Sequence, residues 1–255
     1  MNESTIINAT YDFRLVALSV LIAICASYAA LDLAGRVTAI RNRAHLPWLF
    51  GGAIAMGTGI WSMHYTGMLA YRLPMTVYYH IPTVVLSLVA AIAASFVALF
   101  IVSRPSITVL HVVAGSLLMA TGIATMHYTG MAAMRLPAMH HWDMFYVVMS
   151  VVIAVMVSLA ALGMTSMFRD DKPAKLLKIV CAVIMGFAIP AMHYTAMAAV
   201  SYTSMSEAPD LTYALDISVL ANTAIIIATF VILGSVFVLH QWVDSSPRVT
   251  SNSRA

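Results

Sequence analysis

Seven long apolar stretches, joined by short polar connections, are the feature that most constrains what this chain can fold into. A helix rises about 1.5 Å per residue, so a stretch of ~20 apolar residues crosses the ~30 Å hydrocarbon core of a bilayer. Apolar residues make up 62% of the sequence and charged residues only 9%, which excludes an ordinary soluble domain. The expected helices cover residues 13–35, 47–72, 81–103, 107–136, 144–168, 174–202 and 217–242.

The expected fold class is therefore an all-α, polytopic membrane protein with seven transmembrane helices. Its 255 residues fit a single domain, which we place at residues 1–243, followed by a short polar cytoplasmic tail at residues 244–255. The first residues lack the basic segment and cleavage site of a signal peptide, so the first apolar stretch is expected to be retained. Cys25 and Cys181 lie inside apolar stretches, where packing is their expected role.

The distribution of lysine and arginine over the short connections predicts the orientation in the membrane. One side carries most of the 13 basic residues: Arg36, Arg41, Arg43, Arg104, Arg169, Lys172, Lys175, Lys178, Arg248 and Arg254. The opposite side has Arg14, Arg72 and Arg135. Because cytoplasmic connections are enriched in basic residues, we expect the N-terminus outside and the C-terminus in the cytoplasm. This bias explains the net charge of +3, and no nucleic-acid partner is expected.

One short sequence occurs three times, near the outer ends of the second, fourth and sixth expected helices. The copies read MHYTGM, MHYTGM and MHYTAM, and they contain His64, His127 and His193. All three helices are expected to run outward, so the chain has three parallel two-helix repeats and a seventh helix outside the repeat. The three histidines are then expected at one depth, ~10 Å below the outer helix ends.

The methionines around each histidine indicate a metal site. Positions i and i+4 of a helix share a face, so each histidine and the methionine four residues later can reach the same point. Neutral imidazole and thioether ligands suit a Cu(I)/Cu(II) couple, whereas zinc prefers thiolate, imidazole and carboxylate. The expected ligands are His64, His127, His193, Met68, Met131 and Met197, with Met63, Met126 and Met192, immediately before the histidines, as weaker candidates.

Other side chains near the motifs have supporting roles in this interpretation. The hydroxyls of Tyr65, Tyr128 and Tyr194 are expected to orient the imidazoles by hydrogen bonds. His140 and His141 lie in the outer connection, close to the expected site, where they can capture metal. A further methionine stands eight residues before each histidine, rotated by about 80° around the helix, and is expected to line a neighbouring surface: Met56, Met119 and Met185.

Two features of the helices have structural interpretations. Asp32 is an acid well inside an apolar stretch, and we expect it to pair with Arg36, four residues later. Glycines such as Gly57, Gly59 and Gly122 are expected to allow close contact between helices.

The three motifs and the seven spans resemble the MHYT-domain family of bacterial integral membrane sensors, over nearly the whole chain. The resemblance implies that the Met, His and Tyr of each motif bind copper near the outer face and sense a diatomic gas (O2, CO or NO). It also implies a place in the bacterial inner membrane and a link to cyclic-di-GMP signalling. Members often continue into cyclase or phosphodiesterase modules, whereas only a short polar segment follows Trp242, so a separate signalling partner or a missing output domain is expected.

Three classes of function remain open on the residues alone. A non-catalytic sensory module, with the bilayer and a small diatomic ligand as partners, is the favoured one. Copper transport or storage would need a second site or a polar path toward the cytoplasm. A zinc-dependent membrane hydrolase would need a carboxylate near the motifs, and Asp143 and Asp216 at the outer boundary are the acids that can approach. Haem held by axial imidazoles fits a three-fold repeat poorly.

Overall fold

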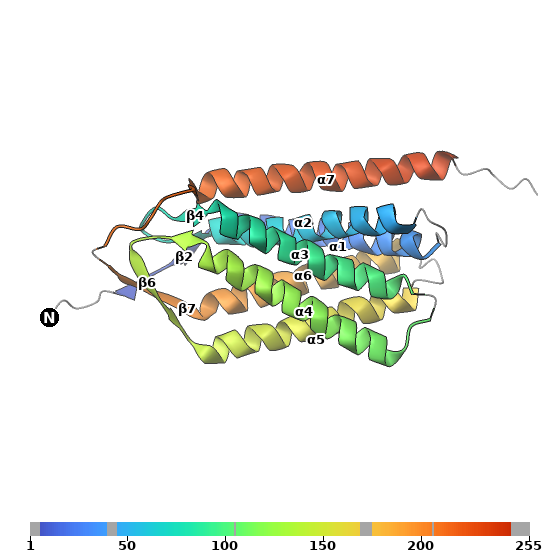
Figure 1. The fold of residues 1–255 in the computed structure, drawn as a ribbon, viewed down its shortest axis with the longest axis horizontal. Coiled ribbons are helices and arrows are strands. Elements are labelled where there is room, and N and C mark those ends of the chain that lie inside the picture. The colour runs from blue at the N-terminus through green and yellow to red at the C-terminus, as the bar shows by residue number, and fades with distance from the viewer. Residues whose placement is uncertain (1–5, 40–44, 105, 169–174, 206, 246–255) are drawn as a thin grey trace, which may run out of the picture.

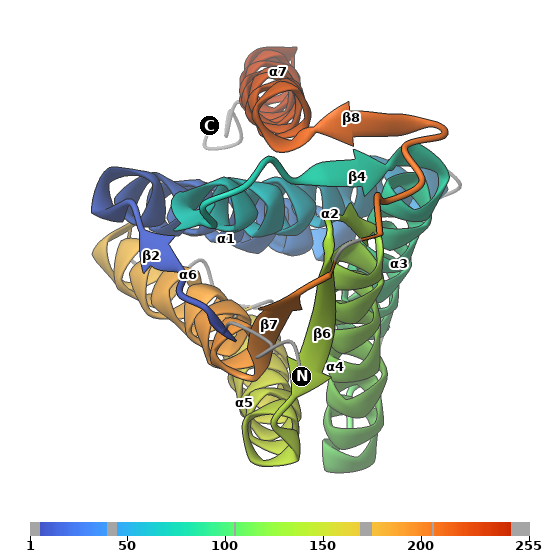
Figure 2. The same ribbon diagram turned by 90° about the vertical axis from the view of Figure 1, so that its left-hand side faces the viewer.

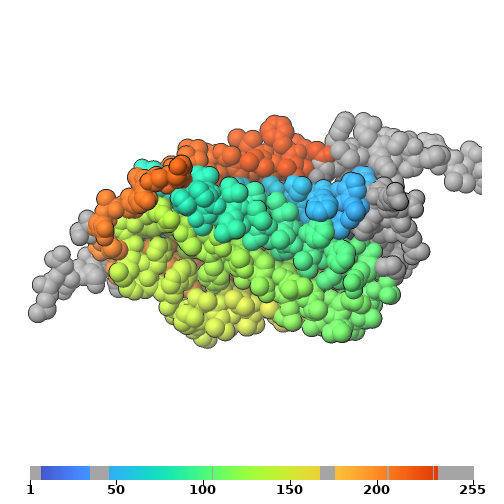
Figure 3. Space-filling model, viewed as in Figure 1, coloured from blue at the N-terminus to red at the C-terminus, as the bar shows by residue number. Residues whose placement is uncertain are grey.

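In the part of the chain that the structure describes, seven long helices form an elongated body (Figure 1 and Figure 3). The structure is a computed structural model that describes residues 6–39, 45–104, 106–168, 175–205 and 207–245. The helices are α1 (Phe13–Ala39), α2 (His45–Ala70), α3 (Ile81–Val102), α4 (Val109–Ala132), α5 (Met144–Phe168), α6 (Lys175–Ala198) and α7 (Ile217–Ser245). This confirms the predicted all-α class with seven helices.

The helices have the length and hydropathy of a multi-pass membrane protein. Within the described part of the chain, α1, α3, α4, α5 and α6 each contain a segment that is long and apolar enough to span a bilayer. The described apolar segment of α7, Ile217–Val231, is shorter than these spans. Helix α2 has 26 residues and therefore a matching length, and it packs between α1, α3 and α7.

Helices α1 to α6 form a closed ring, in which each packs against the next along the chain and α6 returns to α1 (Figure 2). Glycines allow the close approaches, as predicted. A Cβ atom on Gly59 of α2 would lie 2.4 Å from the Cβ of Ala26 in α1, and one on Gly122 of α4 would lie 2.5 Å from that of Ala94 in α3. Helix α7 lies outside the ring against α2, so the ring holds three similar pairs and α7 is an addition.

Short strands at one end of the bundle were not predicted. They are β1 (Ile6–Ile7), β2 (Thr10–Tyr11), β3 (Tyr71–Arg72), β4 (Tyr78–His80), β5 (Met134–Arg135), β6 (Ala138–Trp142), β7 (Val200–Ser204) and β8 (Ala214–Asp216). The expected helices ending at residues 72, 136 and 202 are therefore too long, since α2, α4 and α6 end at Ala70, Ala132 and Ala198. Beyond the bilayer, backbone groups can pair between strands, so the helix is no longer the required conformation.

The strands turn each repeat into a strand–helix–helix–strand unit. The strand before each odd-numbered helix pairs with the strand after the following even-numbered helix: β2 with β3, β4 with β5, and β6 with β7. Strand β8, which leads into α7, pairs with β4 and so begins a fourth half-repeat. Between β2 and β3, Arg72 bonds to Asp12 at 2.8 Å, and this hydrogen bond lowers the pKa of the Asp12 carboxyl.

The opposite end of the bundle carries Arg104 and Lys178. Lys178 of α6 forms an ion pair with Asp32 of α1, and its ammonium lies 5.2 Å from the ring centre of Tyr28. The observed contact joins two helices. The predicted partner of Asp32, Arg36, has a side chain outside the described part, so that pairing stays a prediction. The other basic residues used for the orientation have backbone or side chains outside the described part: Arg41, Arg43, Arg169, Lys172, Lys175, Arg248 and Arg254.

Candidate metal centre

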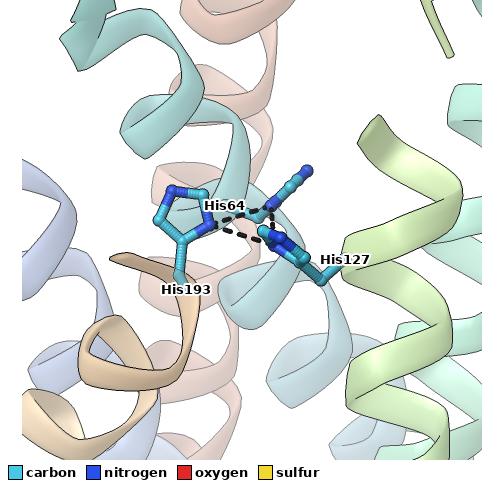
Figure 4. Close-up of side chains that lie close together, drawn as sticks. All are labelled: His64, His127 and His193. Carbon is cyan, nitrogen blue, oxygen red and sulfur yellow. Dashed lines mark hydrogen bonds between the residues drawn. The ribbon is translucent and has the colours of Figure 1, made fainter. Parts of the chain in front are cut away.

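The three motif histidines point toward one another from α2, α4 and α6 (Figure 4). They lie near the ends of these helices that lead into the strands. The Nδ1 atom of His64 lies 3.1 Å from that of His193 and 3.2 Å from that of His127, and the remaining pair is also 3.2 Å apart. Each side chain is at most 1% exposed. The motifs reach one depth because each lies in the last two turns of an even-numbered helix, and the repeats are parallel.

Hydrogen bonding alone cannot satisfy this triangle. An imidazole nitrogen either bears a proton and donates, or bears a lone pair and accepts. Among three Nδ1 atoms in mutual contact, at least one pair must therefore be alike, with two protons or two lone pairs facing each other. The Nε2 atoms of all three rings are buried and have no hydrogen-bond partner in the described part of the chain. A cation between the Nδ1 atoms removes the conflict, because every one of them can then present a lone pair.

The dimensions of the triangle fit a metal ion. Three imidazole nitrogens bound in one plane at ~2.0 Å from a metal lie about 3.5 Å from one another. The observed separations of 3.1–3.2 Å are shorter by a few tenths of an ångström, so a small outward movement of the rings admits the ion. Among the described histidine, cysteine and acidic side chains, this group of three is the one close enough to share a metal.

Helix spacing places thioethers and apolar side chains one turn above and one turn below the three histidines. Met68, Met131 and Met197 lie one turn toward the strands on the face of each helix that bears the histidine, and Ile60, Ile123 and Ile189 lie one turn the other way. The methionines before the histidines are also buried, so all six predicted methionine ligands are at most 2% exposed: Met63, Met126, Met192, Met68, Met131 and Met197. Soft neutral donors and hydrocarbon side chains are thus buried in the layers next to the histidines.

The tyrosine hydroxyls bond to serines and not to the imidazoles, which corrects the predicted role of Tyr65, Tyr128 and Tyr194. A residue that follows the histidine points about 100° around the helix, toward the neighbouring helix of the ring. The hydroxyl pairs are Tyr65 with Ser87 at 3.4 Å, Tyr128 with Ser150 at 2.7 Å, and Tyr194 with Ser19 at 2.9 Å. Each ring edge still packs on its own histidine, with centroids 4.8–5.0 Å apart.

These serines were missed as functional residues, although the sequence contained a signal for them. Each stands at the seventh position of an odd-numbered helix, in the related segments VALS, VVLS and VVMS. Every Tyr–Ser pair joins a motif helix to the first helix of the next repeat, and Ser19 closes the ring from α6 to α1. The three contacts therefore hold the motif helices in a common arrangement around the histidines.

Replacing Tyr128 by phenylalanine is expected to lower the free energy of unfolding by ~1 kcal/mol and to leave metal binding unchanged. The hydroxyl lost is bonded to Ser150, which keeps a second bond to the carbonyl of Val147. Thermal unfolding and metal analysis of detergent-purified protein test this, with Tyr146→Phe on the exposed face of α5 as the control. A large loss of metal in Tyr128→Phe would contradict the assignment of its hydroxyl to the helix contact.

The two outer histidines lie on β6 and face opposite ways, because successive residues of a strand alternate between faces. His140 is partly buried against Tyr202, at 5.1 Å between ring centres, and burial lowers the pKa of its imidazole. His141 is exposed and bonds to the hydroxyl of Thr203 at 2.9 Å. The two side chains lie on opposite faces of β6, and metal capture by His140 and His141 stays a prediction.

The acids at the outer boundary cap helices. The carboxylate of Asp143 accepts a hydrogen bond from the backbone N–H of Phe145 at 2.9 Å, at the start of α5. That of Asp216 accepts one from the N–H of Ser218 at 2.7 Å, at the start of α7. Neither provides a base beside the buried imidazoles.

Comparison with known proteins places the chain in a family. The MHYT family, described as a bacterial signalling protein N-terminal repeat, matches residues 4–46, 57–115, 121–178 and 186–248. The first match covers α1, and the other three begin within α2, α4 and α6, include one motif each and continue through the helix that follows. No solved structure matches the chain significantly.

Three relatives are signalling proteins. MucR of Pseudomonas aeruginosa, a bifunctional diguanylate cyclase/cyclic di-GMP phosphodiesterase, is 42% identical over 195 residues, which are 76% of this chain and 28% of MucR. NbdA of the same organism, a cyclic di-GMP phosphodiesterase, is 34% identical over 75% of this chain and 25% of its own length. The signalling protein YkoW of Bacillus subtilis is 33% identical over 77% of this chain and 25% of its own length. The chain thus matches about a quarter of each relative, and it belongs to the MHYT family of bacterial membrane signalling proteins.

Proposed function

We propose that this protein is a sensory module in which His64, His127 and His193 bind one copper ion, and that the copper binds a diatomic gas such as O2, CO or NO. The observation that supports this most directly is the buried triangle of Nδ1 atoms, 3.1–3.2 Å apart, whose hydrogen bonding is left in conflict. A bound copper ion would supply a soft, redox-active centre with room for an additional small ligand.

Copper is favoured over zinc by the donors around the imidazoles. Six buried methionines flank the cluster, and thioethers are soft ligands that stabilise Cu(I). Zinc catalysis would need a water position and a base, whereas the histidines are at most 1% exposed and the outer acids cap helices. The same burial favours a small, uncharged ligand, because a charged one would lose its hydration on the way in.

The route of the signal follows a hydrogen bond from a motif helix to α7. Ser62, two residues before His64 in α2, donates its hydroxyl proton to the carbonyl of Ala224 in α7 at 2.9 Å, and this bond is buried. The Tyr–Ser pairs spread any movement of one motif helix to the next repeat. A gas transmits a signal only if it binds two packings of these helices with different affinity.

The direction of signalling follows from the proposed topology. With the strand-bearing end outside the bacterial inner membrane, α7 runs inward and delivers the change to the cytoplasm. The relatives that carry cyclase or phosphodiesterase names suggest cyclic di-GMP as the output, through an attached domain or a separate partner.

Elemental analysis with an optical spectrum of detergent-purified protein tests the proposal, followed by titration with CO, NO and O2. We expect near-stoichiometric copper, no Soret band and a spectral change with at least one gas. Zinc in place of copper, or a Soret band, would overturn the assignment of the metal. Absence of any metal after reconstitution with Cu(I) would overturn the sensory proposal and leave the motif as a packing element.

Replacing Ser62 by alanine is expected to keep the copper and to interrupt the path to α7. Loss of the buried hydrogen bond costs ~1 kcal/mol of stability, and gas-dependent changes in hydrogen exchange of α7 should disappear. Thr229→Val in α7 is the control, because that hydroxyl bonds within its own helix, to the carbonyl of Ile225. An unchanged response of α7 in Ser62→Ala would exclude this bond as the route.

A further inference from the structure

A second row of methionines crosses the centre of the ring, two turns inward from the histidines. Met56, Met119 and Met185 stand eight residues before His64, His127 and His193, and are 7%, 1% and 4% exposed. Methionine occupies this position in every repeat, while the residue just before it differs in each copy: Ala55, Leu118 and Ile184. The buried layers along the three helices therefore alternate between thioether, imidazole, isoleucine and thioether again.

The three methionines lie between two small cavities and line both. The cavity on the histidine side has a volume of about 10 Å³ and is also bordered by Ile60 and Ile189. The cavity on the opposite side has a volume of about 20 Å³ and is also bordered by Leu99 and Val102. The three methionines thus border a common pair of cavities, each of which is about the size that one water molecule needs.

One polar group faces this space without a partner. Ser27 of α1 lines the first cavity and is 3% exposed, and its hydroxyl oxygen has no hydrogen-bond partner in the described part of the chain. Buried hydroxyls are normally bonded, and a serine in a helix can bond to the carbonyl four residues earlier. The Ser27 oxygen therefore has lone pairs that it can offer to a ligand held in this cavity.

We propose that Met56, Met119 and Met185 form a second metal site, which binds a soft monovalent cation, Cu(I) or its analogue Ag(I), with the Ser27 oxygen beside it. Three neutral thioethers match a soft ion of low charge, whereas a hard or divalent ion buried among neutral donors would lack compensating anions. The cavities hold about one water-sized occupant, and a single ion meets that limit.

This site does not depend on what the histidines bind. The isoleucine layer of Ile60, Ile123 and Ile189 separates the two clusters, so each can be loaded and removed by itself. Leucine has a similar volume to methionine and would fill the same space, but it has no sulfur to bind a metal. Replacing the three methionines by leucine therefore separates metal binding from packing.

The test compares binding of Ag(I) and of Cu(I), under reducing conditions, to the full chain in detergent. The first variant replaces His64, His127 and His193 together by alanine. The second replaces Met56, Met119 and Met185 together by leucine, and the third combines all six changes. The control replaces three exposed methionines of α5 by leucine: Met144, Met149 and Met156. Bound metal is counted by elemental analysis, and X-ray absorption identifies its ligands. Circular dichroism and size-exclusion chromatography check that each variant is folded. The single change Met119→Leu removes one thioether and serves where the triple methionine variant does not fold.

The histidine variant is expected to retain one equivalent of Cu(I) or Ag(I) with ligands dominated by sulfur, and the combined variant is expected to lose it. The control should bind as the unchanged chain does. Absence of metal from the histidine variant, or equal binding after the Met→Leu changes, would overturn the second site. Failure of the histidine site is a separate result, seen as missing nitrogen ligands in the unchanged chain.

Discussion

Replacing any one of His64, His127 and His193 by alanine is expected to lower the affinity for copper at the histidine cluster by more than ~100-fold. Loss of a group that merely orients a metal ligand costs about 10–100-fold, so loss of a direct ligand should exceed that range. The remaining two Nδ1 atoms can then share one proton in an ordinary hydrogen bond, and the conflict that favours a cation disappears. The triple replacement should abolish nitrogen-bound copper.

The same variants separate binding from folding. Copper at 1,000 times its dissociation constant stabilises a folded protein by ~4 kcal/mol, so the unchanged chain should melt at a clearly higher temperature when loaded. The single-histidine variants should lose the part of this gain that the histidine cluster provides, and they should still show a cooperative transition without metal. His141→Ala, on the exposed face of β6, is the control and should keep both properties. Nitrogen-bound copper that persists in the triple variant, seen by X-ray absorption, would place the metal on other ligands.

Replacing Gly67 by alanine is expected to disrupt the cluster although glycine itself binds nothing. A Cβ atom at this position of α2 would lie 2.5 Å from Nε2 and 2.9 Å from Cδ2 of His193. The ring must turn or retreat, and either movement takes its Nδ1 atom out of the triangle. We expect copper affinity to fall at least ~10-fold, since misplacement of a ligand is comparable with loss of the group that orients it. Gly130→Ala should act alike, with a Cβ 2.4 Å from Nε2 of His64.

Gly51→Ala in the same helix provides a matched control for Gly67→Ala. A Cβ atom at Gly51 meets no atom within 4 Å, and alanine is the better helix former by roughly 0.5–1 kcal/mol. This variant should therefore be equally or more stable and bind copper normally. Equal copper binding by Gly67→Ala and Gly51→Ala, measured by competition with a Cu(I) chelator, would contradict the tight fit of the imidazole against α2.

The helices were predictable because their signal is local. Membrane-length apolar stretches located all seven, and the predicted bounds of residues 144–168 agree with α5. The strands were not predicted because each has only two to five residues, and their pairing partners come from distant parts of the chain. Pairs such as β6 with β7 join segments that meet only after the repeats have packed.

Part of the candidate site could also be predicted from the sequence, and part could not. The repeated motifs predicted that His64, His127 and His193 share a depth, since equal positions on parallel helices reach equal heights in the membrane. They did not predict that Nδ1 is the facing nitrogen, that the tyrosines bond to serines, or that Asp32 pairs with Lys178. Those contacts depend on how far each helix is rotated about its own axis. That rotation is set by packing against neighbouring helices and not by the sequence of one helix.

The sequence by itself determined the membrane class, the seven helices, the three-fold repeat and the family, because apolar length and repetition are properties of the chain before it folds. The tertiary structure alone decided which side chains face one another at the centre of the ring. Close packing through glycines sets the rotation of each helix, and that rotation brings three imidazoles together in one layer and three thioethers around two cavities in another. The sequence specifies which residues each helix carries, but the distances between their side chains follow from contacts among all six helices of the ring.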